Sequence, residues 1–156
     1  MANIWFNTGK LRCWAGATGE VDLVNDTIKM MAHEAVTGID TDDEFVGDFI
    51  GTATEVTSTG YTGGWGGAGR LTLASPALTV DQANNRAEFD CANFTWTAIS
   101  QAAAETWLGF TLIKEITNDA ASPAIAHIDT GAGIPLTPNG SDITLTIDAE
   151  GLLHIT

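Results

Sequence analysis

This chain is organised around the stretch Glu55-Val56-Thr57-Ser58-Thr59-Gly60-Tyr61-Thr62-Gly63-Gly64-Trp65-Gly66-Gly67-Ala68-Gly69-Arg70-Leu71-Thr72-Leu73. Six of the ten residues from Gly60 to Gly69 are glycine. An ordered glycine loses more backbone entropy than any other residue, so a folded chain keeps such a run where it needs positive φ, close backbone approach or adaptability. The chain before this stretch is mixed and acidic, whereas the chain after it alternates between apolar and polar residues as β-strands do.

The alternation after Leu71 predicts a series of short strands with turns between them. Asn84-Asn85 marks the turn of a hairpin, and Asp148 to Gly151 turns the chain into its last strand. Residues 106–116 are the most apolar segment, and we expect them at the centre of a sheet. The expected strands are residues 71–73, 78–80, 87–91, 94–96, 106–116, 124–129, 143–147 and 153–155. Seven or so short strands argue for a mainly β fold, an antiparallel β-sandwich.

The first fifty residues predict one or two short helices near the N-terminus. Residues 4–14 favour a helix of about two turns, and residues 27–33 read as a first core strand. Acidic residues then crowd the start of residues 41–50, which predicts a short helix with Asp40 or Thr41 as its N-cap. We therefore expect residues 1–26 to be an N-terminal segment that packs on the core or on a neighbouring subunit, and residues 27–156 to be one β-sandwich domain.

Composition limits the classes of function. The 156 residues suit one domain with a sizeable core, and 44% hydrophobic against 17% charged residues disfavour disorder. Six basic and twenty acidic side chains give a net charge of −14, so nucleic acid is a poor partner. No apolar run approaches the ~20 residues of a membrane helix, and we expect no secretory leader in residues 1–14.

Nucleotide binding is disfavoured even though residues 64–69 match the letters of G-x-G-x-x-G. That motif works between a strand and a helix, whose N-terminus holds the pyrophosphate. Here the strand-like residues 71–75 follow, and they stop at Pro76. A flexible β-loop is therefore the favoured interpretation of the glycine run.

The search for catalytic or metal-binding motifs yields no enzyme and no cofactor. His33-Glu34 begins like a zinc-protease helix, but Thr37 stands where the second histidine is needed. A calcium loop starting at Asp40 is excluded because Phe45 replaces its glycine and Gly51 its closing glutamate.

The remaining histidines and the cysteines favour structural roles. His127 and His154 lie in expected strands, and we expect them at surface or edge positions. Cys13 and Cys91 are far apart in sequence and next to apolar residues, which favours buried free thiols over a disulfide.

Several short motifs are informative when they are taken together. They are Met1-Ala2-Asn3-Ile4-Trp5-Phe6-Asn7-Thr8-Gly9-Lys10, Val21-Asp22-Leu23, Asp26-Thr27-Ile28-Lys29, Glu55-Val56, Gly60-Tyr61-Thr62-Gly63-Gly64 with Leu71, and Ile143-Thr144-Leu145-Thr146-Ile147-Asp148-Ala149-Glu150-Gly151-Leu152-Leu153. This set resembles a family of tailed-bacteriophage virion proteins, in which an aromatic-x-x-Gly-Lys segment near the N-terminus precedes an Asp-Thr-Ile-Lys strand. The chain departs from the family in its long glycine run with Trp65 and in its Gly131 to Gly140 connection.

The resemblance implies a capsid decoration (cement) protein without catalytic residues, located on the outer surface of the virion and made in the host cytoplasm. Its expected partners are the major capsid protein and further copies of itself on the capsid lattice. A neck, tail or head-fibre component is one alternative, and a carbohydrate-binding module is another. We expect Trp5, Phe6, Tyr61, Trp65 and Arg70 to contact the partner, because large aromatic and arginine side chains dominate interface energetics. For Trp65 the alternative is that the indole folds back onto its own sheet.

Overall fold

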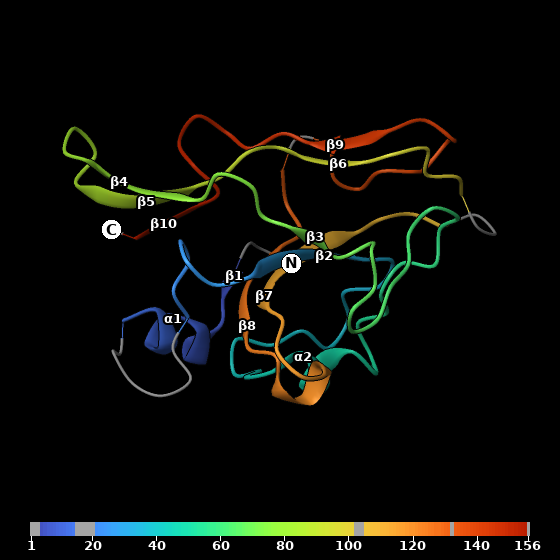
Figure 1. Ribbon diagram of the computed structural model, residues 1–156, viewed down its shortest axis with the longest axis horizontal. Coiled ribbons are helices and arrows are strands. Elements are labelled where there is room, and N and C mark those ends of the chain that lie inside the picture. The colour runs from blue at the N-terminus through green and yellow to red at the C-terminus, as the bar shows by residue number, and fades with distance from the viewer. Residues whose placement is uncertain (1–3, 15–20, 102–104, 132, 156) are drawn as a thin grey trace.

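The computed structural model describes residues 4–14, 21–101, 105–131 and 133–155, and the protein is mainly β (Figure 1). The elements in these ranges are β1 (Ile4–Trp5), α1 (Asn7–Trp14), β2 (Ile28–His33), α2 (Val46–Phe49), β3 (Leu71–Thr72), β4 (Ala77–Asp81), β5 (Arg86–Asp90), β6 (Phe94–Trp96), β7 (Gly109–Lys114), a 3₁₀ turn (Asp119–Ala121), β8 (Ala124–Ile128), β9 (Ile143–Leu145) and β10 (Leu153–Ile155). Among them, neither α-helix has the length and apolar content that crossing a membrane requires.

A five-stranded antiparallel sheet in the order β1-β8-β7-β2-β3 forms the middle layer. β7 lies at its centre and pairs with β2 from Lys114 opposite Ile28 to Gly109 opposite His33. Every residue of β7 except Lys114 is buried. A strand covered on both faces needs apolar residues at consecutive positions, and this pattern correctly predicted the central strand within residues 106–116.

The middle sheet carries a hydrophobic core on each face, because neighbouring residues of a strand point in opposite directions. Met30 of β2 joins one cluster of buried side chains, whereas Met31 joins the other. In β7, Leu112 belongs to the same cluster as Met30, and Ile113 belongs to the same cluster as Met31. The protein is therefore layered on both sides of this sheet.

Two smaller sheets cover one face and complete the expected antiparallel β-sandwich. They have the strand orders β10-β5-β4 and β6-β9, and Figure 1 shows them above the middle sheet. Aromatic rings fill the space between the layers, with Trp96 5.3 Å from Trp107 and 5.5 Å from Phe110 between ring centroids. The hairpin predicted at Asn84-Asn85 is the β4–β5 pair.

The helices and the irregular chain between β2 and β3 cover the opposite face (Figure 1). Phe6 is fully buried there and stacks on Phe49, with ring centroids 5.9 Å apart. The backbone N–H of Phe6 also donates to Ile125 O at 3.1 Å, and β1 pairs with β8. Residues 4–6 therefore pack on their own domain, although Trp14 at the end of α1 stays 69% exposed.

The helix expected over residues 41–50 is much shorter, and its predicted N-cap at Asp40 or Thr41 is wrong. α2 begins only at Val46, and the Asp48 carboxylate accepts hydrogen bonds from the backbone N–H groups just before it. Asp40 instead accepts from the Asp42 N–H at 3.0 Å and closes a local turn. Aspartate side chains offer the backbone such alternatives to helical bonds, and here the turn prevails.

The last two strands do not pair with each other across the turn at residues 148–151. β9 pairs with β6, and β10 crosses to the other small sheet to pair with β5. A turn in sequence fixes a change of direction, but it does not determine which edge the returning strand joins.

The prediction of a surface or edge position is wrong for His127, which is fully buried, whereas His154 is exposed. β1 covers the outer edge of β8, with Ile4 directly opposite His127. Thr111 Oγ1 lies 2.8 Å from His33 Nε2 and 2.9 Å from His127 Nδ1, so the three side chains form a buried polar row. Burial lowers the pKa of His33 to about 3 and that of His127 to about 4, so both rings are neutral at pH 7.

Candidate functional site

Glycine is required at several positions of the glycine run, either by a positive φ or by a close approach of the backbone. Gly64 and Gly66 flank Trp65 with φ values of +79° and +74°, a region that residues with a Cβ rarely adopt. A Cβ on Gly67 would lie 2.2 Å from the Thr62 carbonyl oxygen. The glycines therefore allow the compact path that the backbone takes in this loop.

Arg70 ends this loop and is buried among carboxylates. Its Nε and Nη2 donate to the two oxygens of Glu55 at 2.9 and 2.8 Å. Nη1 and Nη2 donate to Asp119 at 2.5 and 3.1 Å, so both carboxylates are bound in a bidentate fashion. Glu115 lies 3.7 Å from Nη1 and also pairs with Lys29 of β2.

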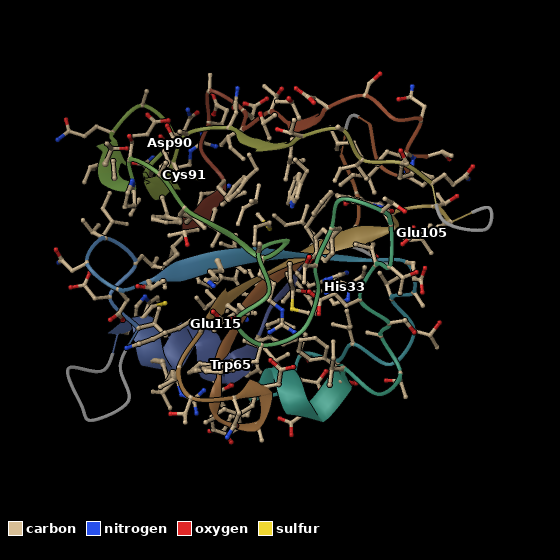
Figure 2. All side chains as sticks on the ribbon, turned by 45° about the vertical axis from the view of Figure 1, so that its right-hand side comes forward. His33, Trp65, Asp90, Cys91, Glu105 and Glu115 are labelled. Atoms are coloured by element: carbon tan, nitrogen blue, oxygen red, sulfur yellow. The ribbon has the colours of Figure 1, made fainter. Side chains whose placement is uncertain are left out.

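The same carboxylates hold the backbone on both sides of Trp65. The Gly64 N–H donates to Glu55 Oε2 at 2.8 Å, and the Gly66 N–H donates to Glu115 Oε1 at 3.0 Å. Figure 2 shows Trp65 and Glu115 close together. The indole Nε1–H of Trp65 donates to the Ile116 carbonyl at 2.9 Å, which fixes the ring relative to the end of β7.

The hydrogen bonds and charges of this cluster shift the pKa values of Arg70 and Tyr61. Burial acts to lower the pKa of Arg70, but the bonds to Glu55 and Asp119 outweigh it and raise that pKa. Tyr61 donates its hydroxyl proton to Glu55 at 2.8 Å and accepts from the Ala32 N–H at 3.1 Å. Burial, followed by the nearby Glu55 charge, raises the pKa of the Tyr61 hydroxyl, so it stays protonated.

The structure places the five predicted contact residues at three levels of burial. Phe6, Tyr61 and Arg70 are 0%, 6% and 2% exposed, so their side chains belong to the interior and the prediction of direct partner contact does not hold for them. Trp5 is partly buried, and it packs against the hydrophobic cluster that contains Met30 and Leu112. Trp65 is 51% exposed and is the predicted residue best placed to meet a partner.

Sequence reasoning missed the residues that support Trp65. Glu115 and Asp119 lie 45 and 49 positions beyond Arg70, and no local pattern connects them to the glycine run. Ile116, whose backbone carbonyl accepts the indole hydrogen bond, is likewise 51 positions from Trp65 in the chain. An arginine directly after a glycine run was the one available signal, since a buried cation requires carboxylate partners.

Two other groups of acidic residues in the described chain have structural explanations. Glu105 is 6% exposed and accepts from Ser58 Oγ at 2.5 Å and from the Thr57 N–H at 2.6 Å. Burial first, and Glu105 second, raise the pKa of Glu34. Three carboxylates close enough to hold a cation surround the guanidinium of Arg86, which pairs with each of them; they are Asp81, Glu88 and Glu150.

Cys13 and Cys91 are both free thiols, as the sequence favoured. Cys91 is buried and Cys13 is partly buried. Burial raises the pKa of each thiol to about 11. Such cysteines behave as small apolar side chains.

Comparisons of this chain with protein-family models, with curated proteins and with solved structures found no match. In chemical terms, the Trp65 loop offers a half-exposed indole on a backbone that is hydrogen-bonded on both sides of it. That arrangement suits binding to an apolar pocket of another macromolecule.

Proposed function

We propose that this protein is a structural component of a tailed-bacteriophage virion that decorates the outer surface of the capsid. It binds the major capsid protein and stabilises contacts between neighbouring capsid subunits. The observation that carries the proposal is Trp65, which is half-exposed on a loop whose backbone is bonded on both sides of it. The motif resemblance to virion proteins supplies the biological context.

The Trp65 loop is organised before it meets a partner. A flexible loop would lose conformational freedom on binding, at about 1–2 kcal/mol for each residue that becomes ordered. Here the bonds from Gly64 and Gly66 to Glu55 and Glu115 already impose that order. More of the free energy from burying the indole is then available for binding.

Arg70 has an indirect part in this proposal. Its guanidinium is enclosed, so it supports the loop through Glu55 and Asp119 and does not touch the partner. The net charge of −14 suits a surface that faces solvent rather than the packaged genome. Many copies on a capsid lattice, each contributing a small free energy, would together stabilise the shell.

Occupancy on particles tests the proposal. Trp65→Ala should raise the Kd for capsids at least about tenfold and so lower the number of bound copies per virion, because truncating an anchoring tryptophan costs ~2 kcal/mol or more. Trp14→Ala is the matched control, since Trp14 is 69% exposed on α1, away from this loop. Both variants should keep the melting temperature of the free protein, and quantitative mass spectrometry of purified virions gives the occupancy.

Two results would contradict the proposal. One is full occupancy of Trp65→Ala on virions, and the other is the absence of the chain from the capsid shell in electron cryo-microscopy of particles that contain it. A copy number far below that of the major capsid protein would favour a neck, tail or head-fibre position. Specific binding of the purified protein on a glycan array would favour a carbohydrate-binding module.

A further inference from the structure

β4 is the longest edge strand in the described part of the protein. It lies at the end of the sheet β10-β5-β4 and pairs on one side only, with β5, over all five residues from Ala77 to Asp81. The other strands at sheet edges have two or three residues each. In an antiparallel pair every second residue directs its N–H and C=O away from its partner, so β4 offers a row of backbone groups to a new strand.

The side chains of β4 that lie on the core side of the sheet are largely exposed. Leu78 lies opposite the buried Phe89 of β5, and Val80 lies opposite Ala87, so both point to the core side of the sheet. Nevertheless Leu78 is 59% and Val80 74% exposed. Two large apolar side chains on an open edge are unusual in a protein that stays alone.

The usual protection of an edge strand is weak here. Natural edges carry charges, prolines or bulges inside the strand. The interior of β4 is Leu78-Thr79-Val80, which has none of these, and its register with β5 is continuous. The one charge is Asp81 at the end of the strand, which pairs with Arg86 at 3.4 Å.

We propose that β4 pairs with β4 of a second copy of this chain, antiparallel and about a two-fold axis at Thr79. In that register Thr79 lies opposite Thr79, and Leu78 lies opposite Val80 of the second copy. Asp81 then faces Ala77, so no two like charges are directly opposite. The sequence of β4 is thus self-complementary, as a two-fold interface requires, and the paired apolar residues cover each other.

The charge of the protein gives this contact a distinctive salt dependence. Two copies that each carry −14 repel each other, so added salt should strengthen their association by screening. A basic partner segment on the same edge would show the opposite trend. A single pair of short strands is smaller than a standard interface of about 1,600 Å², so we expect a weak dimer that forms in the micromolar range or above.

Sedimentation equilibrium of the purified full chain tests this inference without reference to any capsid. The weight-average mass should rise from monomer toward dimer with protein concentration, and the rise should be steeper at higher ionic strength. A monomer mass throughout the concentration and salt series would overturn the inference. Dimerisation that weakens with salt would overturn it as well.

Substitution on β4 locates the contact. Val80→Glu puts a carboxylate into the apolar pairing and should weaken dimerisation at least about tenfold, with an unchanged melting temperature because Val80 is 74% exposed in the single chain. Leu11→Glu adds the same charge at another exposed apolar residue, 63% exposed on α1, and should leave dimerisation intact. A dimer that persists in Val80→Glu, or is lost equally in Leu11→Glu, refutes pairing through β4.

Discussion

Replacing Arg70 by methionine tests whether the buried ion cluster holds the fold around the glycine run. Methionine has a similar length but donates no hydrogen bond. The substitution removes four bonds of 2.5–3.1 Å to Glu55 and Asp119, and it removes the cation that lies 3.7 Å from Glu115. The three carboxylates would then face one another with Lys29 as the remaining cation among these residues.

The expected loss follows from the burial of these partners. The side chains of Glu55 and Glu115 are each 9% exposed, so water cannot replace the lost guanidinium without local unfolding. Leaving buried charge uncompensated costs about 3–5 kcal/mol. In a domain of this size that corresponds to a fall in melting temperature of roughly 6–20 °C. Asp119 contributes less, because its side chain is 24% exposed.

Chemical denaturation of Arg70→Met beside Arg12→Met gives the measurement. Arg12 pairs with Glu44, whose side chain is 45% exposed, so its removal should cost only about 1 kcal/mol. Adding Glu55→Gln to Arg70→Met should recover part of the loss, because it removes one of the unpaired charges. If Arg70→Met is no less stable than Arg12→Met, the cluster does not hold the loop and the reasoning is refuted.

Three further predictions concern the loop, the buried histidines and a thiol. Gly67→Ala should destabilise the fold by about 1–3 kcal/mol, because the added Cβ would clash with the backbone. Gly51→Ala is the control and should have little effect, because a Cβ there meets nothing within 4 Å. Equal denaturation midpoints of the two variants would contradict this prediction. The free energy of unfolding should fall as the pH drops below 6.5, because His33 and His127 bind protons in the unfolded chain but not in the folded protein, where their pKa values are about 3 and 4. A urea midpoint that stays constant down to pH 4 would be inconsistent with neutral buried rings. Cys91 should react slowly with a thiol reagent near pH 8 in the folded protein, because burial raises its pKa to about 11, and rapid modification before unfolding would disprove this.

The sequence predicted those parts of the fold whose signals are local. The hairpin of β4 and β5 follows from alternation around Asn84-Asn85, and the central position of β7 follows from its unbroken apolar run. The same reasoning overestimated the helix at residues 41–50. There the choice between a helix and aspartate-capped turns depends on a few competing hydrogen bonds, which composition does not reveal.

The sequence pointed to Trp65 in the candidate site, but it did not reveal the residues that bond to Arg70 and hold the loop. Trp65 stands out as a large side chain among glycines, whereas the partners of Arg70 are a glutamate 15 positions before it and an aspartate 49 positions after it. Charge balance demands that a buried arginine find carboxylates, but it does not say which of twenty acidic residues will be near.

By itself the sequence determined the β class, the acidity and the strands from β2 onward, because backbone alternation and side-chain charge are properties of neighbouring residues; residues 4–14 favoured a helix throughout, so β1 at Ile4–Trp5 was not predicted. Tertiary structure alone decided that His127 and Arg70 are enclosed while Trp65, Leu78 and Val80 meet solvent. Burial depends on which strands and loops cover a residue, and that covering is set by contacts between segments distant in the chain.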